Sequence, residues 1–297
     1  MYLFWVTSIP GSSRRPAFIG LSAVALTLLA ACSSGGSSSA SGSPAGTGAT
    51  AESTASANAG SAGTGGAGSP AAQQALLAAS TAAQQVNTAV TTLNVKVAGG
   101  AQAGTETGTL QYQRQPSVLM SEDLHIAAQG GTTDIKLILT GTDVYFNEPG
   151  LSPKWTKLSR SSLSGPAAAS FGKLIQGMQS NNVANQQQML AAAKNVHETG
   201  TKTIDGVQTT EYDGSIRASD AINALSPSVR DILGPQLKTL GDSVISFQEW
   251  IDGQHHVRQV IENETVQGHP ITTTMNITGI NQPVQITPPP ASQVTGA

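Results

Sequence analysis

Asp134-Ile135-Lys136-Leu137-Ile138-Leu139-Thr140 decides the fold of this chain, together with the Gly141-Thr142 and Val144-Tyr145-Phe146 that follow it. Ile135, Leu137 and Leu139 alternate with Lys136 and Ile138. A period of two is typical of a β-strand that buries one face. The Gly141-Thr142 pair predicts a tight turn into a second strand. Because so short a turn leaves no room for a crossover helix, we expect the two strands to pair in antiparallel fashion.

The same alternation extends in both directions from this stretch. Gly99-Gly100, Asp205-Gly206 and Asp252-Gly253 supply turn signals between neighbouring runs, and Asp-Gly is a common hairpin turn. Further strands are therefore expected at 93–97, 105–113, 118–127, 155–158, 196–203, 207–216, 244–251, 256–265, 272–277 and 284–286. Long runs of strands joined by tight turns predict an antiparallel meander.

Three stretches carry the period of a helix instead. Apolar residues recur at steps of three and four over 72–90, and Pro70 stands where a helix can begin. Residues 164–194 predict a helix pair with a break at Asn181-Asn182. Residues 220–240 predict two short helices, separated around Pro227 and Gly234-Pro235. The fold class that follows is α+β.

Composition limits the classes of function. Of the 297 residues, 38% are hydrophobic and 11% are charged, which is enough apolar material for one sizeable core. From Gln73 onward there are 13 Lys and Arg against 17 Asp and Glu. The clustered positive charge of a nucleic-acid-binding face is therefore excluded. Cys32 is the only cysteine, so no internal disulfide can form.

The start of the chain has the pattern of an export signal. Arg14 and Arg15 precede a short apolar run over 18–29, and small residues lead from it to Cys32, as in a secretory signal peptide. The apolar run is too short to span a bilayer. We expect residues 1–31 to be removed, 32–70 to form a disordered Ser/Gly/Ala tether, or alternatively a glycosylated stalk, and 71–297 to fold.

Three motifs carry a family resemblance. They are Leu29-Ala30-Ala31-Cys32, the hairpin Ile204-Asp205-Gly206-Val207-Gln208-Thr209-Thr210-Glu211-Tyr212, and Glu249-Trp250-Ile251-Asp252-Gly253-Gln254-His255-His256-Val257-Arg258. The first resembles the lipobox of bacterial lipoproteins, in which the cysteine is acylated and becomes the first residue. With the order of the elements, the three resemble the mycobacterial LppX/LprG-type lipid-carrier lipoproteins, which share a half-barrel fold with the LolA and LolB carriers. The resemblance covers about 71–288.

This resemblance implies both a fold and a function. It implies one curved antiparallel sheet of about ten or eleven strands, a half-barrel with helices packed in its concave face. It implies a membrane anchor at acylated Cys32 on the extracytoplasmic face of an actinobacterial cell membrane. It further implies a protein that binds or transports a lipid, a lipoglycan or another amphiphile, with no enzymatic activity and no cofactor. An envelope transporter or acceptor protein would be its delivery partner.

Strand alternation and the apolar patch of the helix pair indicate which side chains would face such a ligand. Segment 171–190 is a candidate lid that could hinge at Gly177 and at Asn181-Asn182; the alternative is a helix pair that completes a solid core. The predicted lining is Leu93, Val95, Val97, Leu110, Ile135, Leu137, Leu139, Leu174, Ile175 and Met178.

Catalytic and metal-binding motifs are not expected. His255 and His256 are neighbours in a predicted strand, so their side chains point to opposite faces and do not easily share one ion. The sequence contains no nucleophile elbow, zinc-binding helix motif or phosphate-binding loop. Two alternatives remain open. One is a structural or signalling envelope lipoprotein with a filled core that binds a protein partner, and the other is an envelope hydrolase.

Overall fold

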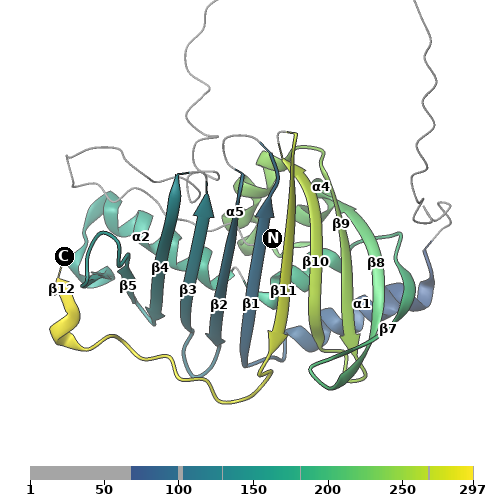
Figure 1. The fold of residues 1–297 in the computed structure, drawn as a ribbon, viewed down its shortest axis with the longest axis horizontal. Helices are drawn as coiled ribbons and strands as arrows, with labels where there is room; N and C mark the ends of the chain where they lie inside the picture. The colour runs from purple at the N-terminus through teal and green to yellow at the C-terminus, as the bar shows by residue number, and fades with distance from the viewer. Residues whose placement is uncertain (1–67, 100–102, 129, 181, 267, 297) are drawn as a thin grey trace, which may run out of the picture.

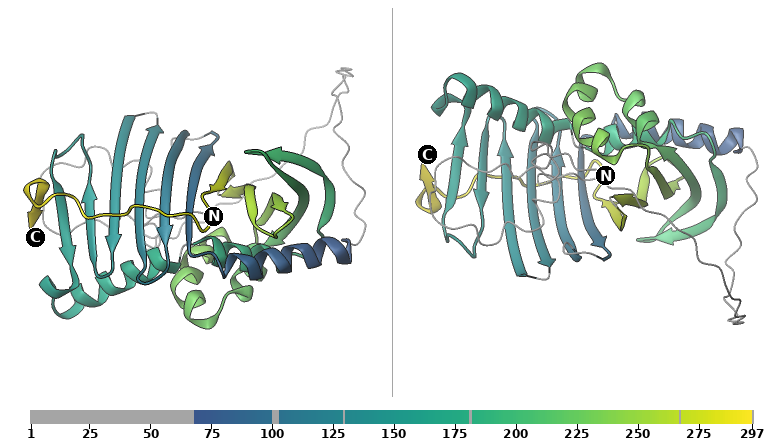
Figure 2. Two further views of the ribbon diagram at one scale, coloured as in Figure 1. Left: turned by 90° about the horizontal axis from the view of Figure 1, so that it is seen from below. Right: turned by 90° about the horizontal axis from the view of Figure 1, so that it is seen from above.

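The computed structural model describes residues 68–99, 103–128, 130–180, 182–266 and 268–296. They form one curved sheet of twelve strands that does not close into a barrel, with helices on one face (Figures 1 and 2). The predicted α+β half-barrel is confirmed, with one or two strands more than expected. The predicted signal peptide 1–31, the lipidation site Cys32 and nearly all of the tether 32–70 lie outside the described residues.

Two meanders build the sheet and meet at its centre. The strands are β1 Thr88–Val97, β2 Gly104–Gln113, β3 Leu119–Ala128, β4 Gly131–Thr140, β5 Asp143–Asn147, β6 Trp155–Ser159, β7 His197–Ile204, β8 Val207–Arg217, β9 Val244–Asp252, β10 Val257–Val266, β11 His269–Thr278 and β12 Val294–Gly296. Their order across the sheet is β12-β6-β5-β4-β3-β2-β1-β11-β10-β9-β8-β7. One meander therefore runs outward from β1 and the other runs inward to β11. All neighbours are antiparallel except β12 and β6.

Five α-helices in the described part of the chain gather on one face of this sheet, and the β7–β8 end curls toward them (Figure 2). None of these helices is long and apolar enough to cross a bilayer. The helices are α1 Pro70–Ala83, α2 Gly165–Ser180, α3 Val183–Leu190, α4 Ala218–Ala224 and α5 Pro227–Leu237. The predicted break between the two helices is confirmed, because α2 ends at Ser180 and α3 begins at Val183 with Asn182 as its N-cap; Asn181 lies outside the described residues.

Two helix boundaries differ from the prediction. The pattern over 72–90 predicted one helix, but α1 ends at Ala83 and β1 already begins at Thr88. Residues 86–92 are rich in Val and Thr, whose branched side chains favour a strand. Pro235 was expected to separate two helices, yet it lies inside α5. Burial of Leu237, which is 3% exposed, keeps the last turn of α5 on the core.

The predicted strand at 284–286 is wrong. These residues have no regular structure, and the chain instead forms β12, which pairs in parallel with β6. Pro283 and Pro288-Pro289-Pro290 flank the segment, and a proline has no N–H to give to a sheet ladder. The segment between β11 and β12 runs past one end of the strands to reach the far edge (Figure 1). We call residues 279–290 the C-terminal strap.

The apolar side chains on the helix-covered face divide into two large clusters. The main cluster joins α1, α3, α4 and α5 to β1 and β8–β11, and its members include Leu76, Leu93, Leu190, Val196, Leu225, Phe247, Val260 and Met275. The second cluster joins α2 to β2–β5 through Leu110, Met120, Leu139, Val144, Phe171 and Ile175. The helices therefore cover the sheet in two regions, α2 over β2–β5 and the other four over β1 and β8–β11, with α2 and α5 in contact.

Gly214 provides a test of packing in the main cluster. It lies in β8 opposite Phe247 of β9, and a Cβ at this position would overlap the Phe247 ring, which is 2% exposed. Because a fully buried ring has little room to move, we expect Gly214→Ala to lower the free energy of unfolding in urea by about 1–3 kcal/mol.

The matched control is Gly253→Ala, where a Cβ meets no atom within 4 Å. Its stability should stay within about 0.5 kcal/mol of that of the unaltered protein. If Gly214→Ala unfolded at the same urea concentration as this control, the packing described for Phe247 would be wrong.

Candidate functional site

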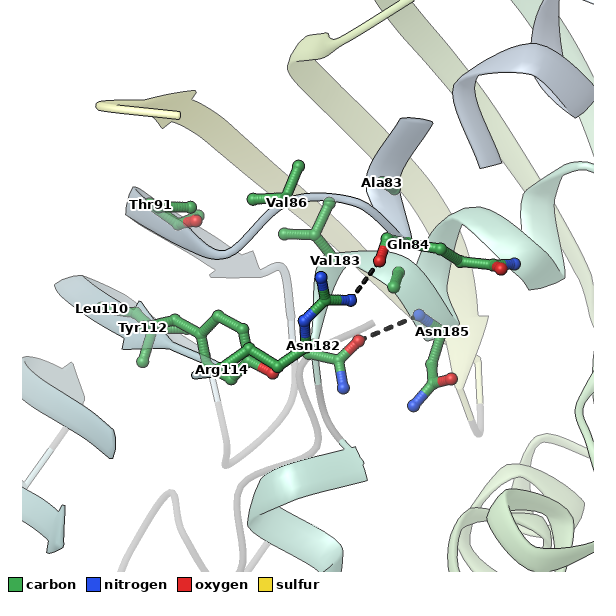
Figure 3. Close-up of a pocket in the computed structure, with 12 residues that line it drawn as sticks. Ala83, Gln84, Val86, Thr91, Leu110, Tyr112, Arg114, Asn182, Val183 and Asn185 are labelled. Atoms are coloured by element: carbon green, nitrogen blue, oxygen red, sulfur yellow. Dashed lines mark hydrogen bonds between the residues drawn. The ribbon is translucent and has the colours of Figure 1, made fainter. Parts of the chain in front are cut away.

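A cavity lies on the helix-covered face between the main and second clusters (Figure 3). Its volume is about 340 Å³, at the lower end of the range of about 300–1,000 Å³ that is typical of ligand pockets. The end of α1, the first half of β1, the end of β2 and the start of α3 form its walls. The lining residues are Ala83, Gln84, Val86, Ala89, Thr91, Leu110, Tyr112, Arg114, Asn182, Val183, Ala184 and Asn185.

The floor of the cavity is the inward face of β1 and β2. Ala89 lies opposite Tyr112, and Thr91 lies opposite Leu110, so the four side chains form two adjacent rows. Ala89 belongs to the main cluster and Leu110 to the second. Because Ala89 and Thr91 are small, this part of the floor leaves space between the two clusters.

The wall opposite the floor is the first turn of α3. The Asn182 Oδ1 accepts a hydrogen bond from the backbone N–H of Asn185 at 3.1 Å, which caps the helix. The Asn182 Nδ2 also donates to the carbonyl of Gln179 at 2.7 Å, and the Asn185 Nδ2 donates to the carbonyl of Ser180 at 2.7 Å. These bonds hold the end of α2 and the start of α3 together beside the cavity.

Arg114 is the only charged residue in the lining. It follows the last residue of β2, and its guanidinium reaches across to Gln84, to whose carbonyl the Nη1 donates (Figure 3). Its Nε is buried and has no hydrogen-bond partner within the described structure. The neighbouring Tyr112 is half-buried; burial raises the pKa of its hydroxyl, and the charge of Arg114 opposes that rise.

Five glutamates occupy inward positions of the sheet, where the described strand residues include no lysine or arginine. Burial raises the pKa of Glu106 to about 7 and the pKa of Glu249 to about 8. Burial, with the charge of Glu106 adding to it, raises the pKa of Glu122 to about 8. Beneath α3, the Gln186 Nε2 donates to the Glu262 Oε1 at 3.0 Å, and Gln187 lies beside Glu249. The fifth, Glu264, also has a pKa raised by burial.

The predicted ligand-lining residues lie on the expected helix-covered side and are shared among several clusters. Leu110 lines the cavity. Leu93 and Val95 pack in the main cluster, Ile135 packs with Leu124 and Ile126, and Val97 is half-buried near the end of β1. Leu137, Leu139, Leu174, Ile175 and Met178 lie in the second cluster or against it. Their contact with a ligand stays a prediction.

Sequence patterns did not single out most of the residues that line the cavity. Arg114 stands alone in a polar turn, Gln113-Arg114-Gln115-Pro116, where nothing distinguishes it from a solvated side chain. Asn182 carried a signal, because it was identified as the break between two helices. The position of this helix junction over β1 and β2 depends on long-range packing, and a local sequence pattern carries no information about such packing.

The predicted strand position of His255 and His256 is wrong, because both lie in the turn between β9, which ends at Asp252, and β10, which begins at Val257. His256 contacts Asp252 in the turn between β9 and β10, with the His256 Nδ1 3.7 Å from the Asp252 Oδ2, and Arg258 binds the same carboxylate at 2.7 Å. His125 lies 2.7 Å from Asp134 on the other face of the sheet. Within the described ranges, no group of three or more His, Cys, Asp or Glu is placed to hold a metal ion.

Comparison with known proteins gives likeness in structure alone. Neither protein-family models nor curated proteins match the chain. LprF from Mycobacterium bovis is 16% identical with a TM-score of 0.49, covering 75% of this chain and 99% of its own. The lipoprotein LppX from Mycobacterium tuberculosis is 16% identical with a TM-score of 0.46, and the match covers 74% of this chain and 100% of the LppX chain.

A putative outer membrane lipoprotein-sorting protein domain from Vibrio parahaemolyticus is 10% identical with a TM-score of 0.27, covering 72% of this chain and 95% of its own. These structural neighbours are mycobacterial lipoproteins and a lipoprotein-sorting domain, as the sequence resemblance suggested. At such low identity, no residue role, ligand or partner passes from them to this chain.

The buried glutamates predict how stability depends on pH. Because the folded-state pKa values of Glu106, Glu122 and Glu249 lie above the ordinary value of 4.5, the folded protein binds more protons than the unfolded chain between about pH 4.5 and 8. The free energy of unfolding should therefore be greatest below this window and fall as the pH rises through it. Urea titrations at several pH values between about 5 and 8.5 would measure this decline.

Glu249→Gln removes one of the three groups and should flatten the decline. Glu198→Gln is the matched control, because Glu198 is exposed in β7 and its replacement should leave the slope unchanged. A free energy of unfolding that rises between pH 5 and pH 8, or an identical slope for Glu249→Gln and the control, would contradict the assignment.

Proposed function

We propose that this chain is an extracytoplasmic lipoprotein, anchored to the membrane through acylated Cys32, that binds an amphiphile in the cavity between α3 and the β1–β2 floor. The observation that carries the proposal is the cavity itself, which lies in the helix-covered face of a half-barrel sheet, where a lipid carrier would need it. The export signal and the cysteine at its end support the anchor. The Ser/Gly/Ala tether would give the folded domain reach above the membrane.

The apolar part of the cavity suits a hydrocarbon chain. Val86 of the loop after α1, Ala89 of β1, Leu110 of β2 and Val183 of α3 supply aliphatic surface. Each methylene removed from water contributes about 0.8 kcal/mol, so even a partly buried acyl chain would bind usefully. A cavity of about 340 Å³ is small, which favours one chain, or one chain of a larger lipid or lipoglycan, over several chains held together.

The junction of α2 and α3 is our candidate for the moving part. Val183, Ala184 and Asn185 form one wall of the cavity, so a shift of α3 would change its volume. The polar bonds of Asn182 connect the two helices at this point. Entry and release of a ligand would follow from movement here. An envelope transporter or acceptor protein would then receive the cargo.

A second function is favoured by the tight packing of the remaining predicted lining. Leu139 is fully buried and Ile175 is 8% exposed, which suits a filled core. On this alternative the chain is a structural or signalling envelope lipoprotein that binds a protein partner and carries no lipid.

Ala184→Phe distinguishes the two functions. Ala184 is half-buried in the first turn of α3 and lines the cavity, so a phenyl ring there would occupy the space for a chain. Native mass spectrometry of the gently purified protein should detect a bound amphiphile, and Ala184→Phe should reduce the bound fraction at least about tenfold.

Ala71→Phe, on the exposed first turn of α1, is the control and should keep the bound mass. A mass equal to the bare polypeptide for both the unaltered protein and the control would reject amphiphile binding and favour the filled-core alternative.

Cys32→Ala tests the anchor. Without the thiol there is nothing to acylate, so the protein should move from the membrane fraction to the soluble extracytoplasmic fraction when cells are separated. Ser39→Ala, in the same tether, should remain with the membrane. Equal membrane retention of Cys32→Ala and Ser39→Ala would show that the anchor is not at this cysteine.

A further inference from the structure

We infer that the cavity selects an amphiphile with an anionic group and that Arg114 binds that group. The inference rests on the proposed function and names the class of ligand for the same site. It depends on three observations: the charge of the lining, the unused donor of Arg114, and the arrangement of polar and apolar walls.

The lining of the cavity carries only positive charge. Among the twelve residues that line the cavity, Arg114 is charged and the rest are neutral. No carboxylate of the described chain pairs with Arg114 in an ion pair that would use up its charge. An anion entering the cavity would therefore meet a cation and no opposing anion in the walls.

The buried carboxyl of the strand next to the floor does not add a negative charge to the lining at pH 7. Glu122 of β3 lies opposite Leu110, one strand beyond the lining, and its side chain is 6% exposed. Burial holds this carboxyl in its neutral form at pH 7. Tyr112, the other titratable group beside Arg114, is also neutral at that pH, because the ordinary pKa of its hydroxyl is 10.0 and burial raises that pKa further.

Arg114 has a hydrogen-bond donor, the Nε–H, that no acceptor in the described structure uses. Its Nη1 donates to the carbonyl of Gln84, which holds the guanidinium between the end of β2 and the end of α1 (Figure 3). Its Nε is buried and has no acceptor within the described structure, and a buried donor without an acceptor is unfavourable. The Nε–H and the adjacent terminal N–H form the edge on which carboxylates and phosphates bind through two parallel hydrogen bonds.

The polar and apolar walls of the cavity indicate where the anionic group and the hydrocarbon chain of such a ligand would bind. Arg114, Gln84 and Asn182 supply the polar side, while Leu110 and Ala89 form the apolar floor. A single-chain amphiphile would fit with its anionic group at Arg114 and its chain on the floor. The shared chemistry is a carboxylate, sulfate or phosphate on a hydrocarbon chain.

The test compares ligands that share a ten-carbon chain and differ in charge. The protein is the full chain carrying Cys32→Ala, which changes no described residue. Isothermal titration calorimetry would measure decanoate, decyl phosphate, decanol and decyltrimethylammonium, with inorganic phosphate alone to separate a free anion from a lipid headgroup. We expect decanoate and decyl phosphate to bind about 10- to 100-fold more tightly than decanol, as a charge-assisted hydrogen bond provides.

Arg114→Gln should remove that preference while leaving decanol binding within about twofold, and Arg114→Lys should keep part of it because the charge remains without the planar fork. Arg217→Gln is the control, since Arg217 is an exposed arginine at the end of β8 and its loss should change no affinity. If Arg114→Gln fails to fold, the ligand series on the unaltered site and Arg114→Lys still decide the question.

Each outcome has a definite meaning. Equal affinity for decanoate, decanol and decyltrimethylammonium would overturn the role of Arg114 and leave amphiphile binding intact. Inorganic phosphate binding as tightly as decyl phosphate would overturn the inference, because the chain would then contribute nothing. Failure of every ten-carbon ligand to bind would overturn the proposed function together with the inference.

Discussion

The antiparallel pairing of β1 with β11 joins two meanders that come from opposite ends of the folded chain. Val90 lies opposite Thr278, and Val97 lies opposite Ile271. The other antiparallel ladders join strands that follow one another along the chain, whereas this one closes a loop of nearly 190 residues. The entropy of that closure can be offset only when both meanders are present. The two halves of the sheet therefore depend on each other through one ladder.

The cavity follows from this construction. Four helices pack over β1 and β8–β11, and α2 packs over β2–β5. The division falls beside the central ladder, at the border between β1 and β2. The small side chains of Ala89 and Thr91 leave space at this border, and the start of α3 forms the opposite wall of that space. The junction of two packed clusters on a curved sheet thus leaves space for a cavity.

Sequence patterns could predict the elements that depend on local periodicity. The alternation around Ile135, Leu137 and Leu139 identified a strand whose inward face is the one predicted, and Asn181-Asn182 marked a helix junction. The predictions are wrong where contacts with residues far away in the sequence determine the secondary structure. The β-branched run after Ala83 becomes β1 because β2 and β11 lie on either side of it. Pro235 stays within α5 because Leu237 is buried in the main cluster.

The candidate site was less accessible to sequence patterns than the fold. Leu110 was identified from alternation, yet Arg114, Val86 and Ala184 come from a turn, a loop and a helix start with no shared pattern. Only the register of β1 with β2 and the position of α3 bring them together. The inward glutamates likewise look like ordinary strand residues until burial reveals their environment.

The C-terminal strap has a mechanical consequence. The strap is bound at the centre of the sheet: the Asn281 Oδ1 accepts from the Asn87 N–H just before β1 at 2.7 Å, and the Thr88 Oγ1 donates to the Gln282 carbonyl at 2.6 Å. Beyond the strap, β12 pairs with β6. The half from β1 to β6 is thus spanned by backbone twice, once through its own strands and once through the strap. The half that ends at β7 is also spanned twice, because α1 runs from beside β7, where the Ser69 N–H donates to the Val196 carbonyl, to the start of β1 (Figure 1). Each half of the sheet therefore has a second backbone connection that resists elastic bending, the strap on one side and α1 on the other.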